Sequence, residues 1–487
     1  MSVSSTSTAG GLRRALPFRT VVSTSTGLAY AAISLLGCVQ VAWYLAGDSA
    51  WIALLIAGVL ALVAAFCFSE LNALYPSAAA IRQYLTAAYS ERASLTVSFG
   101  YVLTIVTVIA ADSYVVAQAI HFLFPSTPTL LWILVMLGLA MCANLLGIRI
   151  AGLVQDLTTY ALLISLAAIS IIALSKGGFH LNQPTAGLHT PIKLLNAVAL
   201  GVFVFSAFEW VTPLSEEVNN VKWIPRGMFI SLGLLFVSYA LFTVAATHLV
   251  GLHTLCPGNS ANSCTPAPQM YLGKLALGRA GEVWMLVATL FTGVMTFNGG
   301  FATASRFLYA AAREATLPRF FARLSVSRAV PWVPVVLLAV ASAAVAVVIN
   351  ATGKYVILIL VGAVLEAFVY ALAGLCVIQL RRRQRDAVRS FRIPLGWTIP
   401  ILAIVIFSVL GVAAGVTPNP LPLALTVVLF GVSYLYVRYY VPRLRAKEQA
   451  LREARGSRRR RPSAATGAEE GAPALAGEGQ GENPAGE

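Results

Sequence analysis

Charged residues are scarce in this sequence. Only 11% of its 487 residues are Asp, Glu, Lys or Arg, whereas about 25% is ordinary in a soluble domain. Apolar residues make up 58% of the chain, and the mean hydropathy is +0.79. This composition excludes a soluble enzyme and is typical of a chain that crosses the lipid bilayer many times.

Motifs for metal or redox chemistry are also missing. The sequence contains neither a CxxC nor an HExxH pattern, so we expect no metal site and no cofactor. Two of the six cysteines, Cys256 and Cys264, lie in a polar stretch that we expect outside the membrane, where a disulfide between them is favoured. The other four lie in apolar runs and are interpreted as small packing residues: Cys38, Cys67, Cys142 and Cys376.

Long apolar runs dominate what is present. A membrane-spanning helix needs about 20 mostly apolar residues, and twelve such runs fit the chain. The sequence therefore predicts an all-α integral membrane protein with twelve transmembrane helices, at about 20–45, 51–75, 94–122, 130–147, 153–175, 195–214, 228–250, 282–310, 332–349, 354–380, 397–416 and 421–441.

The formal charge of +15 is explained by membrane topology. With the N-terminus in the cytoplasm, 29 of the 34 Lys and Arg fall on the cytoplasmic side. This bias predicts that both termini are cytoplasmic in the cell membrane. The basic run Arg458 to Arg461 has no interleaved aromatic residues, so nucleic-acid binding is not expected. The sequence indicates no oligomeric state.

Two of the predicted spans are interrupted by small polar residues. The first contains Ser25-Thr26-Gly27, and the sixth contains Phe203 to Trp210 with Ser206 and Ala207 in its middle. Such residues make a helix easy to unwind, although they also allow close helix packing. Because each interrupted span opens one half of the chain, the pattern favours a transporter built from inverted repeats.

Several motifs resemble those of the amino acid-polyamine-organocation (APC) transporter superfamily. They are Phe68 to Ala80 with Tyr84 in span 2, Asn144 with Gly147 near span 5, Phe203 to Glu209 with Glu216, Pro225 and Arg226 after span 6, and Asn298 with Ser305 to Pro318 in span 8. The span-8 match is the most specific. The family's Gly in span 6 is Ala207 here, and a span-5 Lys of some proton-coupled members is Leu162.

The resemblance implies a LeuT-type fold with two inverted five-helix repeats and two peripheral helices. The expected parts are an N-terminal tail (1–19), repeats at 20–193 and 194–392, spans 11 and 12 (393–441), and a mostly disordered tail (442–487). The substrate would lie between broken spans 1 and 6. Its carboxylate would meet backbone N–H groups, and the site residues would be Ser25, Thr26, Gly27, Phe203, Phe205, Ser206, Ala207, Phe208, Asp112 and Asn298.

Carboxylates inside the predicted spans are few and therefore informative, because an unpaired ionised group is costly there. Glu209 borders the span-6 interruption, where it would carry a proton, gate the site, or tie helices together. Asp112 is a candidate partner for a substrate ammonium. Glu366 and Asp156 are interpreted as structural or lipid-interface groups, and Glu70 as the partner of a loop Arg.

The sequence thus favours a secondary transporter that moves an amino acid across the cell membrane by alternating access. Proton coupling and exchange both stay open. A transporter of polyamines or other organic cations is the alternative, favoured if Asp112 and Glu209 both face the cavity. A channel or a membrane sensor is the alternative of a different class, and the sequence contains no catalytic constellation that would indicate an enzyme.

Overall fold

The computed structural model describes residues 14–45, 50–177, 191–258, 263–325, 328–416 and 420–460. The regular elements of these ranges are helices. One isolated β-bridge pairs Leu16 with Val218. In the first half they are α1 (Phe18–Ala29), α2 (Ala32–Tyr44), α3 (Ala50–Leu74), α4 (Ile81–Ala88), α5 (Glu91–Leu123), α6 (Thr129–Leu145) and α7 (Ile148–Gly177).

The second half begins with α8 (Pro191–Phe205) and the 3-10 helix η1 (Phe208–Glu216). The remaining elements are α9 (Trp223–Leu249), α10 (Leu252–Leu255), α11 (Pro268–Arg313), the 3-10 helix η3 (Arg319–Ala322), α12 (Trp332–Thr352), α13 (Tyr355–Arg383), α14 (Thr398–Val416), α15 (Leu421–Leu435), the π-helix η4 (Tyr436–Tyr440) and α16 (Val441–Arg460).

Ten helical segments of the described residues are long and apolar enough to cross a membrane. The pair α1 and α2, bent by 54° at a short break, makes an eleventh crossing if it counts as one span. Helix α6, with 17 residues, is a shorter apolar helix. The all-helical membrane fold predicted from the sequence is confirmed, whereas the exact count of twelve is not.

The two interrupted spans lie in the middle of the bundle. All of Thr20–Ala29 and Ala32–Ala42 is buried, so α1 and α2 are covered on every side. Helices α7, α9 and α11 pack around α1, while α3 and α2 pack against α8. A helix that is buried all round, as these are, has no face left for lipid.

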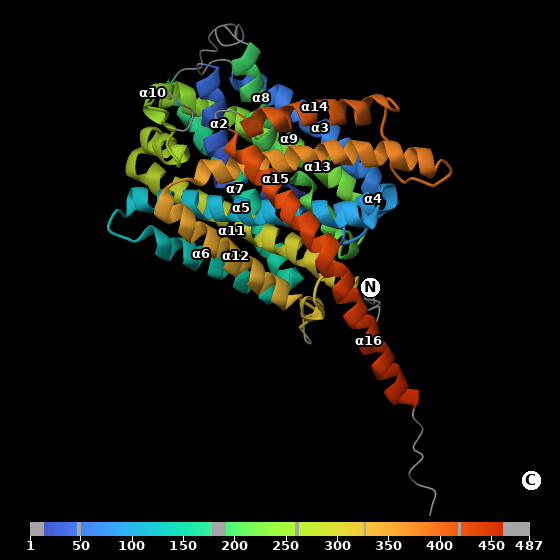
Figure 1. Cartoon of the computed structure of the whole chain (residues 1–487). Coiled ribbons are helices and arrows are strands. Elements are labelled where there is room, and N and C mark those ends of the chain that lie inside the picture. The colour runs from blue at the N-terminus through green and yellow to red at the C-terminus, as the bar shows by residue number, and fades with distance from the viewer. Residues whose placement is uncertain are drawn as a thin grey trace, which may run out of the picture.

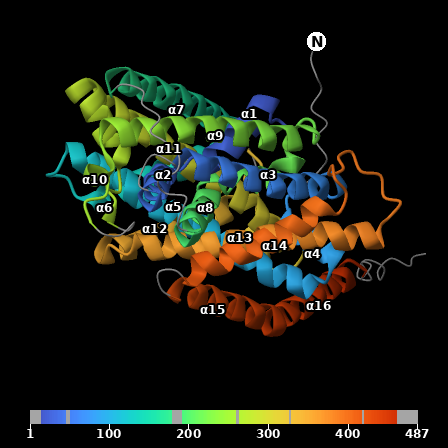
Figure 2. The same cartoon turned by 90° about the horizontal axis from the view of Figure 1, so that it is seen from above.

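The outer helices expose apolar side chains. Helix α15 buries only Pro422, Thr426 and Ser433, and its exposed residues include Val427 and Val428. Helices α6 and α12 lie side by side along one edge, and α14 packs on α13 (Figures 1 and 2). Exposed Leu, Ile and Val side chains on these helices suit the hydrocarbon core of a bilayer.

One end of the bundle holds the start of the described chain close to the end of η1. Leu16 N donates to Glu217 O at 3.0 Å, and Asn219 N donates to Leu16 O at 3.2 Å. The Glu217 carboxylate in turn accepts from Arg306 Nε at 2.9 Å, and both side chains are buried. The segment before α1, the segment after η1 and α11 are therefore fastened to one another at this end, which we call the α4 end.

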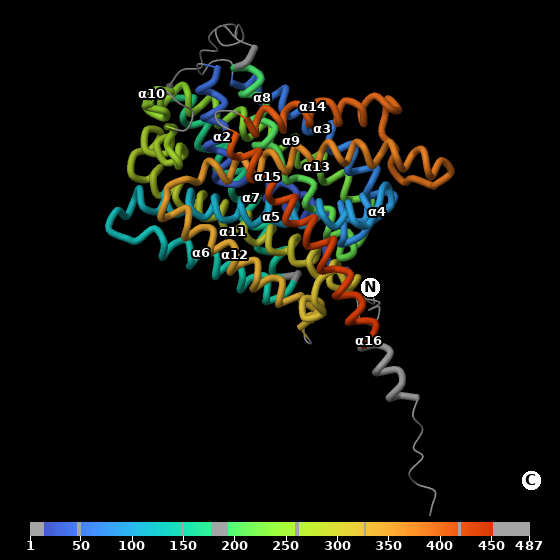
Figure 3. The backbone as a smooth tube through the Cα atoms, viewed as in Figure 1, coloured from blue at the N-terminus to red at the C-terminus, as the bar shows by residue number. Residues whose placement is uncertain are grey.

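The C-terminal segment begins with a helix. Helix α16 ends at Arg460, within residues 442–487, which the sequence predicts to be a mostly disordered tail. The backbone trace shows α15 lying across the bundle and the first turns of α16 leading away from it (Figure 3). Residues 441–460 are rich in Arg, Ala, Leu, Glu and Lys, which are strong helix formers, and Arg445 pairs with Glu91 of α5. Residues 461–487 and 1–13, predicted as tails, lie outside the described residues.

Candidate functional site

The first helix break separates α1 from α2 at Tyr30 and Ala31. The Ser/Thr/Gly cluster predicts this break at Ser25 to Gly27, which is wrong, because those residues are α-helical. Ala29 O accepts hydrogen bonds from Tyr239 Oη at 2.7 Å and Ser34 Oγ at 2.9 Å, neither of which is a backbone group. Side chains from outside α1 thus replace the helical hydrogen bonds at the true break.

The second helix break, at Ser206 and Ala207 between α8 and η1, lies where the sequence predicts it. Ala207 adopts a left-handed conformation with φ of 75°, which is strained for a residue with a Cβ atom. Its N–H donates to Tyr370 Oη at 3.2 Å. The backbone turns here, and the ordinary helical ladder of α8 ends.

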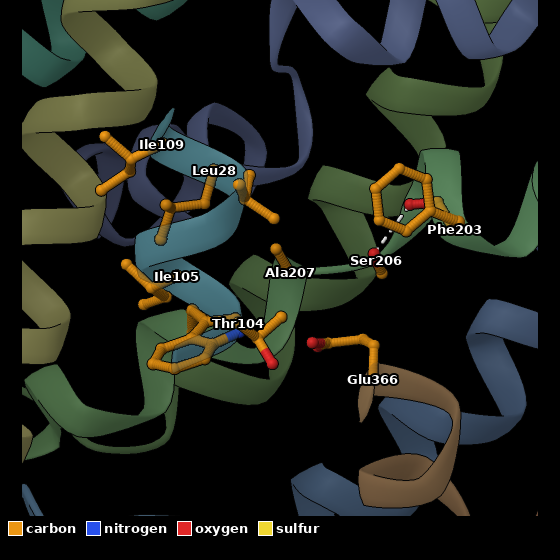
Figure 4. A pocket seen from close by; sticks show the side chains of 10 residues that line it. Leu28, Thr104, Ile105, Ile109, Phe203, Ser206, Ala207 and Glu366 are labelled. Atoms are coloured by element: carbon orange, nitrogen blue, oxygen red, sulfur yellow. Dashed lines mark hydrogen bonds between the residues drawn. The ribbon is translucent and has the colours of Figure 1, made fainter. Parts of the chain in front are cut away.

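A small cavity lies beside the second break (Figure 4). Four helical segments contribute to its wall: α1, α5, the α8–η1 break and α13. Most of the side chains are apolar, and the polar ones are Thr104, Ser206 and Glu366. The complete lining is Leu28, Thr104, Ile105, Val108, Ile109, Phe203, Ser206, Ala207, Trp210 and Glu366.

Three of the predicted substrate-binding residues line this cavity, namely Phe203, Ser206 and Ala207. Phe205 and Phe208 are fully buried elsewhere: Phe205 packs edge-on against Tyr239, and Phe208 packs against Tyr370. Phe208 is therefore packed inside the bundle and does not face lipid. Trp210 is also buried, and its ring stacks on Tyr101 at 3.8 Å while it closes one side of the cavity.

The predicted contact segment Ser25 to Gly27 serves to join helices. Ser25 Oγ donates to Phe208 O at 2.7 Å, so it ties α1 directly to η1. Thr26 Oγ1 donates to Val22 O of its own helix at 2.8 Å. A Cβ atom on Gly27 would overlap the Gln155 side chain and lie 2.7 Å from Met295 Cγ, so Gly27 permits close packing of α1 on α7 and α11.

Asp112 lies at the amino end of α2 and is fully buried outside the lining of the cavity. Its Oδ1 accepts from Ile33 N at 2.8 Å. No side chain of α2's own N-cap residue performs this role. The carboxylate from α5 therefore caps the amino end of the half-helix that follows the first break.

Asn298 belongs to a buried polar network that joins three helices. Its Nδ2 donates to Ala151 O at 2.9 Å and to Gln155 Oε1 at 3.0 Å, and its Oδ1 accepts from Asn144 Nδ2 at 2.9 Å. It lines a second, smaller cavity between α1, α7, η1 and α11. The structure places Asn298 in this network and not in the wall of the larger cavity.

Glu209 is held by two tyrosines. Tyr101 Oη donates to its Oε1 at 2.8 Å, and Tyr370 Oη donates to its Oε2 at 2.7 Å. Tyr101 comes from α5 and Tyr370 from α13, and Glu209 itself is fully buried. Of the roles considered from the sequence, the geometry shows the hydrogen bonds that tie helices together. The proton and gating roles stay predictions.

Glu366 is the residue of this site that sequence reasoning missed. It was interpreted as a structural or lipid-interface group, but it is 3% exposed and lines the cavity. Its carboxylate points from α13 towards Thr104 (Figure 4). A carboxylate in the middle of an apolar span was the available signal, but the sequence alone does not tell which face of the helix meets the cavity.

The remaining carboxylates lie nearer the α4 end. Glu70 pairs with Arg381 of α13 and with Arg389 of the loop that follows α13. The sequence predicts such a pairing with a loop Arg. Asp156 accepts from Thr20 Oγ1 at 2.9 Å and pairs with Arg19 at 3.0 Å.

Cys256 and Cys264 are bonded to each other in a disulfide.

Comparison with known proteins agrees with this architecture. A family model described as amino acid permease matches residues 17–436. Large neutral amino acids transporter small subunit 2 of Rattus norvegicus is 26% identical over 405 residues, which cover 79% of this chain and 73% of that protein. The serine/threonine exchanger SteT of Bacillus subtilis is 25% identical over 382 residues, covering 75% of this chain and 83% of that protein.

A solved structure shares the fold. It is the substrate-bound, outward-open state of a Na⁺-coupled sialic acid symporter, with a TM-score of 0.52 and 12% identity over 83% of this chain and 91% of that chain. At this identity the likeness establishes the LeuT-type fold alone. Taken with the family match over residues 17–436, these findings show that the chain belongs to the amino acid permease family and is a multi-pass membrane transporter, not an enzyme.

Proposed function

We propose that this protein is a secondary active transporter that moves a small solute with an ammonium group, such as an amino acid, across the cell membrane by alternating access. The cavity between the breaks at Tyr30–Ala31 and Ser206–Ala207 carries the proposal. The named relatives are amino acid transporters and exchangers, which supports the solute class.

The chemistry of the second break suits an ammonium group. The last carbonyl groups of a helix lack intrahelical partners, and the C-terminal end of a helix favours a positive charge. Helix α8 ends at Phe205, next to the cavity. The carbonyls of Phe203, Phe205 and Ser206 are therefore the proposed acceptors for the ammonium, although Phe203 O already accepts from Ser206 N at 3.0 Å.

The proposed topology follows from the distribution of Lys and Arg. The α4 end would face the cytoplasm together with both termini, and the loop with Cys256 and Cys264 would face outward. Alternating access would then require the α4 end and the opposite end to open in turn. Proton symport and exchange are both compatible with this scheme.

Counterflow in proteoliposomes tests the proposal. Purified protein is reconstituted into vesicles preloaded with one unlabelled amino acid at a time, and uptake of the labelled compound is followed. A transporter gives saturable uptake that the internal substrate accelerates. Uptake that rises linearly with concentration and ignores the internal solute would indicate a channel and contradict the proposal.

A further inference from the structure

Two buried carboxyl groups meet at the wall of the cavity. Glu366 of α13 is 3% exposed, Glu209 of η1 is fully buried, and their side chains interact with each other. The Glu366 side chain also interacts with Trp210 and Tyr370, and its carboxyl group points into the cavity towards Thr104 (Figure 4). No Lys, Arg or His is among the residues that line this cavity, so no basic side chain balances the pair there.

The hydrogen atoms available to this cluster can be counted. Tyr101 has one O–H group, which it donates to Glu209 Oε1, and Tyr370 has one O–H group, which it donates to Glu209 Oε2. Trp210 has a single N–H donor and no acceptor. Neither tyrosine therefore has a hydrogen left for Glu366, and its contacts with Glu209 and Tyr370 bring oxygen against oxygen.

The contact between the two carboxyl groups therefore requires a proton of its own. Two ionised carboxylates side by side repel each other strongly in a low-dielectric site, so a buried pair keeps one proton between its members. Glu209 already accepts a hydrogen bond at each of its oxygens, whereas Glu366 accepts none from either tyrosine. The proton thus belongs on Glu366, which donates it to the oxygen that it meets.

The titratable groups that interact with Glu366 come from three elements: Tyr101 of α5, Glu209 of η1 and Tyr370 of α13. Charged groups on the other helices packed against α13 belong to separate contacts, to helix ends or to the surface. They are Glu70 of α3, paired with Arg381; Arg82 of α4, paired with Glu314; Asp112 of α5, bonded to Ile33; Glu91, paired with Arg445; Arg92 and His121 near the ends of α5; and the exposed Lys193 of α8. Helix α14 contains no titratable residue.

We propose that Glu366 and Glu209 share one proton and that Glu366 exchanges this proton with water during transport. This inference rests on the proposed function and selects proton symport from the coupling schemes left open there. Glu366 lines the cavity and Glu209 does not, so water that enters the opened cavity reaches Glu366 first. The exchange breaks the O–H bond of the carboxylic acid and passes the proton to water. Two ionised carboxylates then stand in contact, and their repulsion separates α13 from η1 beside the second break.

Infrared spectroscopy of the purified full-length protein tests the shared proton without a substrate. A protonated carboxyl group has a C=O stretching band that an ionised carboxylate lacks. Labelling glutamate with ¹³C shifts this band for Glu and leaves any band of Asp112 in place. We expect one shifted band at neutral pH, and we expect Glu366→Gln to remove it. Absence of a protonated glutamate at neutral pH would overturn the proposal.

Glu282→Gln is the matched control for the spectrum. Glu282 accepts from Arg279 at 3.0 Å near the kink in α11 and does not line the cavity. This carboxylate is ionised, so its replacement should leave the band unchanged. Loss of the band in Glu282→Gln as well would contradict its assignment to Glu366.

Proteoliposomes then test the exchange. Uptake of labelled leucine and labelled serine is measured with and without an inward proton gradient, and counterflow is measured at equal pH on both sides. Glu366→Gln should reduce proton-driven accumulation at least tenfold and keep counterflow within about threefold, because the amide N–H permanently takes the place of the shared proton. Glu366→Asp retains an exchangeable proton and should keep part of the accumulation.

Two results would overturn the assignment. If Glu366→Gln keeps proton-driven accumulation while Glu209→Gln loses it, Glu209 alone carries the proton. If Glu366→Gln loses counterflow and accumulation equally and melts at a lower temperature than the parent, Glu366 has a structural role and no part in proton exchange.

The outcomes separate this inference from the proposed function. Counterflow that no proton gradient stimulates would overturn the inference and leave the proposed function intact. Absence of counterflow for every amino acid would instead contradict the proposed function, while the infrared band would still report whether Glu366 and Glu209 share a proton.

Discussion

Tyr370 Oη donates to Glu209 Oε2 at 2.7 Å and accepts from the N–H of Ala207 at 3.2 Å. One hydroxyl group of α13 therefore contacts both the backbone of the second helix break and the carboxylate that follows it. Tyr101 Oη binds the other oxygen of Glu209 from α5. A change of charge on Glu209 would alter the contacts of three segments at the wall of the cavity.

Glu209→Gln should keep substrate binding but remove most of the pH dependence of uptake, because an amide does not exchange a proton. Initial rates in proteoliposomes at several pH values measure this effect. Tyr101→Phe is the control, since it removes one hydrogen bond to Glu209 and keeps the carboxylate. An unchanged pH profile in Glu209→Gln would place the titrating group on another residue or remove it from the mechanism.

Glu70→Ala should destabilise the protein by about 3–5 kcal/mol, because it leaves the buried Arg381 without its carboxylate. Arg381 Nε donates to Glu70 Oε1 at 2.8 Å, and the N–H of Ile393 donates to Oε2 at 2.9 Å. Glu91→Ala, which breaks a half-exposed pair with Arg445, should cost less than about 1 kcal/mol. Thermal denaturation in detergent compares the two variants, and equal losses would contradict the interpretation.

Ala207→Gly should raise stability by roughly 0.5–1 kcal/mol. Relief of the left-handed strain at φ 75° is worth about 1–2 kcal/mol, and the greater freedom of glycine in the unfolded chain offsets part of it. Ala199→Gly, inside α8, should instead lower stability by a similar amount. If both variants shift the melting temperature downward, strain at Ala207 is not stored in the folded state.

Gly27→Val should abolish transport while membrane insertion stays near normal. The reason is steric, because the new side chain would overlap Gln155 and push α1 away from α7 and α11. Ser25→Ala should weaken transport more than Thr26→Ala, since Ser25 bonds to η1 whereas Thr26 bonds within its own helix. Uptake normalised to surface expression gives the order, and normal transport by Gly27→Val would refute the packing argument.

The bond between Cys256 and Cys264 should be present in protein isolated under non-reducing conditions. Mass spectrometry of unreduced peptides should find the linked pair, and replacing both cysteines by Ser should lower stability by roughly 2–3 kcal/mol for a loop of this length. Cys142→Ser is the control, because Cys142 is a free cysteine on the surface. Free thiols at both positions would refute the assignment.

The second helix break was predictable from the sequence and the first was not. Small residues at Ser206 and Ala207 interrupt an otherwise bulky apolar run, so the local sequence identifies the break. In the first span, Thr26 Oγ1 bonds back to Val22 O, and the polar cluster stays helical. The break at Tyr30 depends on the Tyr239 hydroxyl, which comes from 210 residues away in the sequence.

The candidate site was predictable only in part for a similar reason. Composition identifies Glu366 and Asp112 as unusual carboxylates in apolar spans, but their environments come from helices far away in the chain. Asp112 meets Ile33, 79 residues earlier, and Glu366 meets residues of α1, α5 and η1 across the cavity. Hydropathy determines which segments cross the membrane, whereas helix rotation and packing decide which side chains share a cavity.

The bridge between Leu16 and Val218, together with the Arg306–Glu217 ion pair, has a mechanical consequence. It links the entry to the first interrupted helix to the exit of the second, at the same end of the bundle. A displacement of either segment would therefore carry the other with it or break the hydrogen bonds between them. We therefore expect the two interrupted helices to move together at this end, where the Arg306–Glu217 ion pair attaches them to α11.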